Sequence, residues 1–303
     1  MKVLVTGGAG FLGSNLTKYL LDQGHEVVVI DDLSYGDVSL VDPRSEFHKE
    51  SIANQKYLEK ILPNINVVFH LAALSTIGLS LERPDLYFEH NVMYGIKLLE
   101  AMKVTGVKKI IFSSTGGAAY GGADKLSFRE EDPTEPINAY GSSKIAFEPV
   151  LSAYWNSFGI EAIILRYFNI YGPNDDQADT PRAIPIWIKA AIAGKPFPVY
   201  WQGKQKRDYV YVGDVCRANL IAAEKGRGYR VYNVGGGIGL WMYDIAEKIN
   251  CAFGGNCKIK DMGERFGDVP IAVANITRIK EELGWKPEVF FDEGLRITLD
   301  HYK

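Results

Sequence analysis

The feature that most constrains this chain is a glycine-rich turn directly after its first apolar run. Residues 3–6 are apolar, and residues 6–13 read TGGAGFLG. Apolar residues at helical spacing follow over residues 11–21. A strand, a glycine turn and a helix in this order predict a site where backbone N–H groups and a helix N-terminus hold the phosphates of a dinucleotide.

The spacing within this turn and the residue that ends the second apolar run define the expected cofactor. Gly7, Gly10 and Gly13 match TGxxGxxG. Asp31 ends the second run, where a carboxylate can accept hydrogen bonds from an adenosine ribose. The same carboxylate would repel a 2′-phosphate, and residues 14–16 and 32–36 contain no lysine or arginine. These observations favour NAD over NADP.

The alternation of apolar runs and helical patterns predicts the fold class. The apolar runs are residues 3–6, 26–30, 67–71, 109–113 and 162–167, and helical patterns occupy residues 11–21, 54–62, 84–105 and 139–158. Continuous apolar strands separated by helices are typical of a doubly wound parallel (Rossmann) α/β sheet. We therefore expect an NAD-binding domain over residues 1–171. Prolines and short strand signals then indicate a smaller α+β substrate lobe over residues 172–303, with some segments returning to the first domain.

Composition excludes several classes of protein. The 303 residues carry 34 Lys and Arg against 37 Asp and Glu, so the net charge of −3 argues against a nucleic-acid partner. No apolar run reaches the roughly 18 residues of a membrane span, and glycines interrupt the N-terminal apolar stretch that a signal peptide would need. Cys216, Cys251 and Cys257 form no CxxC pair, which argues against a zinc site and a disulfide scaffold, although a Cys251–Cys257 bridge stays open. We expect a cytoplasmic protein without a metal.

Catalytic chemistry is indicated by a tyrosine and a lysine four residues apart. Tyr140 and Lys144 would share one face of the helix predicted over residues 139–158. A neighbouring ammonium is expected to lower the pKa of the phenol toward the working pH. The spacing recurs at Tyr200 and Lys204, among prolines and glycines where a helix is not expected. Tyr140 is preferred because hydroxyl residues end the fourth strand, at the sheet edge where ligands bind.

Ordered motifs along the whole chain resemble the extended short-chain dehydrogenases/reductases, specifically the NAD-dependent sugar-nucleotide epimerase/dehydratase family, and within it the UDP-glucose 4-epimerases. These motifs are TGGAGFLGS at 6–14, HLAA at 70–73, FSSTGGAAYG at 112–121, YGSSK at 140–144, RYFNIYGP at 166–173, KRDYVYVGDV at 206–215, GDVP at 267–270 and LGWKP at 283–287.

The resemblance implies roles for particular residues. Thr115, Tyr140 and Lys144 would form the catalytic triad, with Ser114 as the alternative to Thr115. The cofactor would be held by Gly7, Gly10, Phe11, Leu12, Asp31, Asp32, Ser51, Ile52, Leu71, Ala72, Ala73, Ser113, Tyr140, Lys144 and Tyr167, although Glu50–Ile52 departs from the family's adenine-contacting sequence. The substrate would contact Thr76, Thr115, Asn169, Arg207, Arg265, Asp268 and Ala272.

The implied reaction is 4-epimerisation of a UDP-hexose. Tyr140 would remove the proton of the 4-hydroxyl, hydride would pass to NAD, and return to the opposite face of a transient 4-keto sugar would invert C4. Thr115 is followed by two glycines rather than by the acidic residue usual in dehydratases. A UDP-uronate epimerase, a dehydratase, a reductase and a non-catalytic NAD sensor are the alternatives.

Two further expectations concern substrate breadth and assembly. Ala272 would leave room for an N-acetyl group, so UDP-GlcNAc and UDP-GalNAc are expected substrates beside UDP-glucose and UDP-galactose. Leu74 and Thr76 differ from common family choices and keep another hexose or a uronate open. The resemblance also implies a homodimer joined through a four-helix bundle formed by the helices at 84–105 and 139–158.

Overall fold

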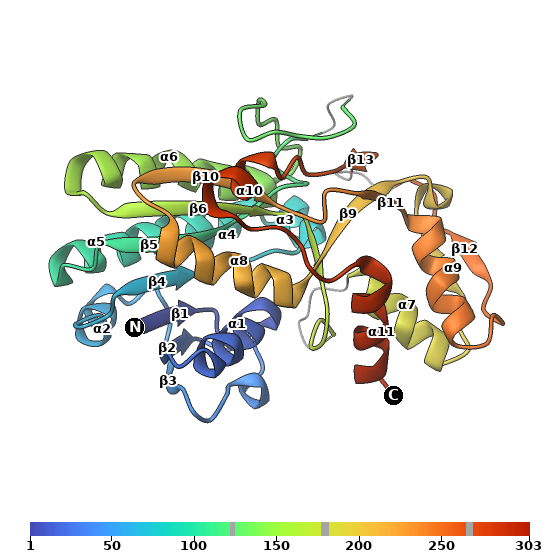
Figure 1. Cartoon of the computed structure of the whole chain (residues 1–303), viewed down its shortest axis with the longest axis horizontal. Coiled ribbons are helices and arrows are strands. Elements are labelled where there is room, and N and C mark those ends of the chain that lie inside the picture. Colours follow the sequence, from blue (N-terminus) through green and yellow to red (C-terminus); the bar gives the residue numbers. More distant parts are fainter. Residues whose placement is uncertain (122–124, 177–181, 265–268) are drawn as a thin grey trace.

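The central element of the protein is a sheet of seven parallel strands in the order β10-β6-β5-β4-β1-β2-β3 (Figure 1). A computed structural model describes residues 1–121, 125–176, 182–264 and 269–303. The strands are β1 (Lys2–Thr6), β2 (Glu26–Asp31), β3 (Glu46–Lys49), β4 (Val67–His70), β5 (Lys109–Thr115), β6 (Glu161–Tyr167) and β10 (Tyr229–Val234). The strand order reverses at β1, which lies between β2 and β4, so the predicted doubly wound Rossmann sheet is confirmed.

Helices cover both faces of this sheet. On one face lie α1 (Phe11–Asp22), α8 (Val212–Lys225) and α10 (Thr277–Leu283), which share a buried apolar cluster with the strands. On the other face lie α2 (Gln55–Ile61), α5 (Tyr94–Thr105) and α6 (Ala139–Phe158), with a second cluster. This two-sided cover explains the continuous apolar strands: the interior of β1, for example, is fully buried over Val3–Val5.

The helical pattern at 84–105 is not a single regular helix. It begins as α4 (Pro84–Phe88), continues through a π-helical turn at Glu89–Met93 and ends as α5. A short helix, α3 (Ile77–Glu82), precedes it. Single π turns inside helices are frequent at functional sites, and His90 of this turn lines the cavity described below.

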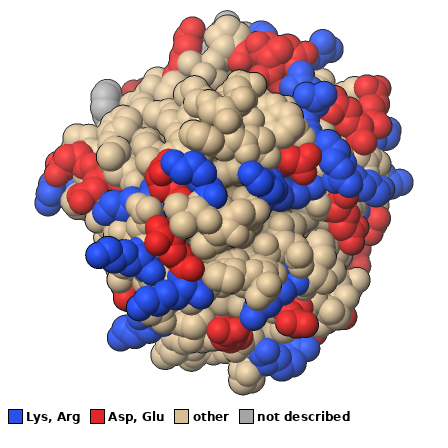
Figure 2. All heavy atoms as spheres, turned by 90° about the vertical axis from the view of Figure 1, so that its left-hand side faces the viewer, with Lys and Arg blue, Asp and Glu red and all other residues tan. Residues whose placement is uncertain are grey.

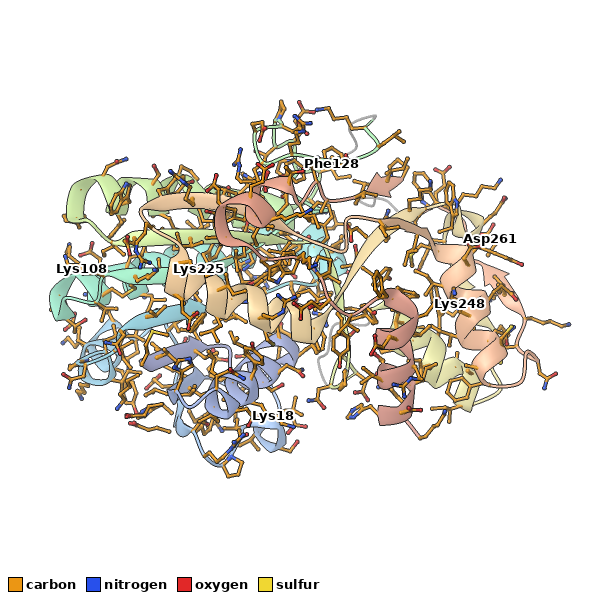
Figure 3. All side chains as sticks on the ribbon, viewed as in Figure 1. Lys18, Lys108, Phe128, Lys225, Lys248 and Asp261 are labelled. Carbon is orange, nitrogen blue, oxygen red and sulfur yellow. The ribbon has the colours of Figure 1, made fainter. Side chains whose placement is uncertain are left out.

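A smaller lobe stands beside the carboxyl edge of the sheet and lies at the right of Figure 1. Its strand β9 (Lys206–Tyr211) pairs with β7 (Asn169–Tyr171), β11 (Gly239–Trp241) and β13 (Ile271–Ala272), while β8 (Phe197–Val199) pairs with β12 (Ile259–Asp261). Its helices are α7 (Ala183–Ile192), α9 (Met242–Ala252) and α11 (Phe291–His301). Lys248 and Asp261 mark this lobe in Figure 3.

The chain passes repeatedly between the two lobes. After β9 it returns to the large sheet as α8 and β10, then re-enters the smaller lobe as β11 and α9. The loop after β5 also reaches the C-terminal segment: Phe128, at the top of Figure 3, forms a parallel bridge with Ala274. The Phe128 ring stacks on Tyr120, with 4.9 Å between the ring centres.

Surface charge, cysteine pairing and helix hydropathy can be compared with the expectations from composition. Lys and Arg are interspersed with Asp and Glu on the face shown in Figure 2, and neither sign forms a continuous field there. The cysteines Cys216, Cys251 and Cys257 are all free, so the Cys251–Cys257 bridge that the sequence left open is absent. Among the helices in the described parts of the chain, we find none with the length and apolar character to cross a membrane.

Candidate active site

One large cavity, with a volume of about 690 Å³, opens at the carboxyl edge of the sheet and extends to the smaller lobe. It gathers every predicted site residue that the structure describes. These lining residues are Gly7, Gly10, Phe11, Leu12, Asp31, Asp32, Ser51, Ile52, Leu71, Ala72, Ala73, Thr76, Ser113, Ser114, Thr115, Tyr140, Lys144, Tyr167, Asn169, Arg207 and Ala272. Arg265 and Asp268 lie outside the described residues, so their predicted contacts stay predictions.

The glycine turn between β1 and α1 is too close-packed to accept side chains. Gly7 has a φ of +72°, and a Cβ there would lie 2.8 Å from the Ala72 nitrogen. A Cβ at Gly13 would lie 2.0 Å from the Gly7 carbonyl oxygen. No side chain caps α1, so the first-turn N–H groups of this helix are left for another acceptor. A pyrophosphate fits this cradle because it supplies that acceptor and its negative charge favours a helix N-terminus.

The segment after β4 is tied to the same turn. The Thr6 hydroxyl accepts hydrogen bonds from the Leu71 and Ala72 nitrogens at 3.2 and 3.1 Å. It also pairs with Nδ1 of His70 at 2.9 Å, while Nε2 of that buried ring has no partner among the residues that the structure describes. Burial and the charge of Lys144 lower the pKa of His70 to about 3. The imidazole therefore stays neutral. Its hydrogen bond to Thr6 links the ends of β4 and β1.

Asp31 ends β2 beside this turn. Its two carboxylate oxygens accept hydrogen bonds from the Ala9 nitrogen at 3.0 Å and the Leu33 nitrogen at 2.9 Å. Burial raises the pKa of Asp31. The neighbouring segment contributes Asp32, Tyr35 and other uncharged or acidic residues to the cavity, so a ribose fits better here than a ribose phosphate.

The hydroxyl-rich end of β5 meets the first turn of α6, where the catalytic residues were predicted. Asn138 begins this helix by accepting a hydrogen bond from the Gly141 nitrogen, at 2.8 Å. Tyr140 then lines the cavity, and the Thr115 side chain is close enough to lower the pKa of its phenol. Lys144, one turn later, donates to the Ser113 carbonyl at 2.7 Å, and its ammonium lies 4.9 Å from the centre of the Phe112 ring.

The electrostatics of this pair differ from the sequence expectation. Burial raises the pKa of Tyr140, and the two influences that lower it are the Thr115 hydrogen bond and the charge of Arg182. Lys144 was expected to lower the pKa of the phenol, but burial instead lowers its own pKa to about 7. The reason is that the ammonium is desolvated, which leaves it only partly charged at neutral pH.

The side chain of Ser114 makes a different contact from that of Thr115. Its hydroxyl donates to Glu148 at 2.7 Å, and Glu148 forms a buried ion pair with Arg166 at 2.6 Å. Successive side chains on a strand point to opposite faces, so Ser114 and Thr115 cannot both face Tyr140. The geometry favours Thr115 over Ser114 as the partner of the phenol.

The remaining predicted residues line the side of the cavity nearest the smaller lobe. Tyr167 donates its hydroxyl to Asn219 at 2.9 Å, which fixes the ring in the cavity wall. Asn169 begins β7, and Arg207 of β9 is nearly buried and donates to the Lys206 and Pro270 carbonyls. Ala272 pairs in register with Arg207.

The second Tyr–Lys spacing lies elsewhere in the cavity wall. Tyr200 lines the cavity, but residues Trp201–Gly203 form a short 3₁₀ turn in which Gln202 has a φ of +55°. Tyr200 and Lys204 therefore do not share an α-helical face, which agrees with the expectation that no helix forms there.

Sequence reasoning missed two charged cavity residues, Asp175 and Arg182, which form an ion pair. Burial raises the pKa of Asp175 to about 6, although Arg182 opposes this shift. No motif marked these residues, because neither belongs to a motif or to a periodic stretch of the sequence. Their only sequence signal is that charges follow the RYFNIYGP motif. Among the described residues, no group of three or more His, Cys, Asp or Glu is arranged to hold a metal ion.

The family model described as the NAD dependent epimerase/dehydratase family matches residues 3–235. The chain belongs to this family. This membership confirms the resemblance stated from the motifs and the predicted NAD cofactor. The roles of individual site residues stay predictions.

Solved structures are similar over the full length. A UDP-glucose 4-epimerase from Thermotoga maritima with UDP-glucose is 36% identical, with a TM-score of 0.96 over 100% of this chain and 98% of that one. One from Thermus thermophilus in complex with NAD is 36% identical, with a TM-score of 0.93 over 100% and 99%. A UDP-N-acetylglucosamine 4-epimerase from Methanobrevibacter ruminantium in complex with UDP-N-acetylmuramic acid is 32% identical, with a TM-score of 0.93 over 99% and 97%.

Proposed function

We propose that this protein is an NAD-dependent epimerase that inverts C4 of UDP-hexoses. The observation that carries the proposal is that one cavity joins the uncapped N-terminus of α1 to Tyr140 and Thr115. The first feature suits a dinucleotide, and the second suits proton transfer at a sugar hydroxyl. Relatives named UDP-glucose 4-epimerase, similar over the whole chain, support the same reaction.

In the proposed reaction, each of these residues has a separate role. NAD, when bound, supplies the acceptor and donor of the hydride that leaves and returns to C4 through a transient 4-keto sugar. Tyr140 takes the proton of the 4-hydroxyl and gives it back. Thr115, whose side chain lowers the pKa of the phenol, would orient it. Lys144, which donates to the Ser113 carbonyl, would contact the cofactor ribose.

The neighbourhood of Thr115 favours epimerisation over dehydration. The two residues after it are glycines, and a Cβ at Gly117 would lie 3.4 Å from the Ala272 side chain. The acidic residues in the described cavity wall are Asp31, Asp32, Glu50 and Asp175, which come from the ends of β2 and β3 and from the segment after β7. None of them adjoins Thr115 in the chain to remove a proton from C5.

We also infer that N-acetylated substrates are accepted. Ala272 is a small side chain in the cavity wall, in register with Arg207, which the family resemblance assigns to the substrate diphosphate. A small residue there leaves volume for a 2-acetamido group. The similar structure from Methanobrevibacter ruminantium, an epimerase of an N-acetyl sugar, supports this breadth.

We also propose that the protein forms a homodimer and that it is cytoplasmic. The helical layer containing α4, the π turn and α6 exposes Phe88, Met93 and Phe158, which are 41%, 53% and 42% accessible. Exposed apolar side chains on neighbouring helices suit a bundle with a second copy. The location follows from the sequence expectation alone.

The test of function is an NMR time course with UDP-galactose, UDP-GalNAc and UDP-galacturonate, run without and with added NAD. We expect conversion of the first two to the C4 epimers with no net change in NADH. Conversion of UDP-galacturonate alone would replace the hexose assignment with a uronate epimerase. A 4-keto-6-deoxy product would indicate a dehydratase, and no conversion of any sugar would contradict the proposed enzyme.

A further inference from the structure

The cavity that would hold two diphosphates has few positive charges. Among its described lining residues, the lysines and arginines are Lys144, Arg182 and Arg207. Lys144 is buried and committed to the Ser113 carbonyl. Arg207 belongs to β9 of the smaller lobe. Arg182, which immediately precedes α7, has no role in the function proposed above.

Arg182 lies beside the start of α1. Its guanidinium carbon is 4.9 Å from the centre of the ring of Phe11, the first residue of that helix. The charge of Arg182 also lowers the pKa of Tyr140, so the guanidinium lies within electrostatic range of the catalytic phenol. Arg182 thus stands between the uncapped helix N-terminus and the reacting end of the cavity.

The position of Arg182 is fixed from two sides. Nδ2 of Asn15 donates to the Phe11 carbonyl at 2.9 Å and to the Pro173 carbonyl at 3.1 Å, which fastens the segment after β7 to the first turn of α1. Asp175 of this segment is 2% exposed and accepts a hydrogen bond from Nη1 of Arg182. Its other oxygen, Oδ2, is buried at the cavity without a partner in the described structure.

The chemistry of this arrangement suits a diphosphate. A helix N-terminus supplies only about half a unit of positive charge, whereas the bridging diphosphate of NAD carries two negative charges. A guanidinium has five N–H donors and binds phosphate through a planar fork. The described structure commits one Arg182 nitrogen to Asp175, so other donors remain for a ligand.

We propose that Arg182 is a diphosphate-binding residue that closes over the phosphates held by the first turn of α1, and that Asp175 positions its guanidinium. The nearness of Phe11 assigns this contact to the cofactor. The substrate diphosphate has the same chemistry and is the competing ligand. The proposal rests on the dinucleotide-dependent function proposed above and adds to it a residue that retains the cofactor during turnover.

The test compares Arg182→Gln with Lys189→Gln. Lys189 lies on α7, the helix that Arg182 precedes, is 57% exposed at its side chain and does not line the cavity, so its variant removes one positive charge away from the cavity. Calorimetry would measure the affinity of the purified protein, freed of nucleotide, for ADP-ribose, adenosine and UDP at low and high salt. ADP-ribose carries the diphosphate, whereas adenosine lacks it.

We expect Arg182→Gln to weaken ADP-ribose binding by about tenfold or more, the effect of one charge-assisted contact. Affinity for adenosine and UDP should stay unchanged, and the difference between variant and wild type should shrink as salt rises. Unchanged ADP-ribose affinity would overturn the proposal. A loss confined to UDP would also overturn it, by assigning Arg182 to the substrate.

Asp175→Asn provides a second test, in which Arg182 keeps its positive charge. The guanidinium is retained but loses its ionic partner, so we expect a smaller loss of ADP-ribose affinity than in Arg182→Gln. An unchanged affinity of Asp175→Asn for ADP-ribose would contradict the positioning role of Asp175. Saturating NAD should restore epimerisation to Arg182→Gln. If wild-type protein shows no epimerisation, the proposed function fails, and the binding comparison still decides the role of Arg182.

Discussion

At the scale of single residues, the environment of Tyr140 decides how the chemistry begins. Burial raises the pKa of this phenol, and its lowering influences come from Thr115 and Arg182 rather than from Lys144. A bound nicotinamide would bring a further positive charge to this cavity. If Tyr140 is the base, as proposed above, its activation would then depend on occupation of the cofactor site.

Replacing Tyr140 with phenylalanine should remove the proton acceptor and little else. We expect kcat to fall by about 10² to 10⁴, while NAD stays bound, because the ring keeps its place in the cavity wall. Stopped assays of UDP-galactose conversion and a count of NAD per chain would measure both. Tyr154→Phe is the matched control: it lies on the same helix, and its hydroxyl donates to Glu100. Undiminished turnover in Tyr140→Phe would refute the assigned base.

Substituting Ala272 should narrow the range of substrates. Ala272→Tyr fills the volume proposed for the acetamido group, so we expect conversion of UDP-GalNAc to fall by about tenfold or more while UDP-galactose is still turned over. Ala272→Ser, nearly equal in volume, should keep both activities. Parallel kcat/KM measurements check this, and equal losses for the two sugars would show that Ala272 does not set the range.

At the scale of elements, the sequence predicted the units with strong local signals. The glycine turn, α1 and the Tyr–Lys helix α6 were predicted because glycine spacing and apolar periodicity are local properties. β3 and the π turn at Glu89–Met93 were missed. β3 is short and only partly buried, and a π turn leaves the helical pattern almost unchanged.

The variant Gly13→Ala tests whether the close packing of the glycine turn is needed for NAD binding and for stability. A Cβ in Gly13→Ala would approach the Gly7 carbonyl to 2.0 Å, so the turn must open. We expect loss of NAD binding, together with a fall in the free energy of unfolding of roughly 1–3 kcal/mol from overpacking. In Gly78→Ala the added Cβ meets nothing within 4 Å, so that variant should be nearly silent. Urea unfolding and NAD titration would measure these effects; normal NAD affinity in Gly13→Ala would contradict this account of the turn.

At the scale of the whole molecule, the meeting of Thr115, Tyr140 and Lys144 in one cavity was predictable, whereas that of Asp175 and Arg182 was not. Thr115, Tyr140 and Lys144 follow motifs on regular elements. Asp175 and Arg182 form an ion pair that could not be predicted, since no motif or sequence periodicity links the two residues. The cross-lobe contact of Phe128 with Ala274 was equally beyond local reasoning.

Global stability should depend on pH through His70. Its folded-state pKa, about 3, lies below the ordinary value of 6.5. The unfolded chain therefore binds more protons between these values, and stability falls as pH drops from about 6.5 toward 3. For this group the slope is about 1.4 kcal/mol per pH unit well below 6.5.

His70→Gln keeps a polar side chain beside Thr6 but cannot titrate. Urea unfolding at pH 7 and pH 5 should show that the variant loses about 2 kcal/mol less than wild type over this interval. His301→Gln, at an exposed position, should follow the wild-type dependence. Parallel pH curves for wild type and His70→Gln would show that the buried imidazole does not control acid sensitivity.

Assembly is the other property of the whole molecule. Met93→Glu places a charge within the exposed apolar set on the α4–α6 layer, so we expect the dimer to dissociate to monomers. Ile192→Glu makes the same change at a 56% exposed position on α7 and should leave a dimer. Sedimentation velocity would distinguish the two. A monomeric wild-type protein, or a dimer that persists in Met93→Glu, would contradict the proposed bundle.

The return of α8 and β10 to the large sheet limits how this protein can be divided. A fragment ending at residue 171 would end just after β7, leaving β6 as a bare edge strand and uncovering the face on which α8 lies. Such an exposed edge invites intermolecular strand pairing. Truncation would thus produce an insoluble remnant rather than a nucleotide-binding module, and any grafting or swapping of the sugar-recognising portion must preserve several chain crossings at once.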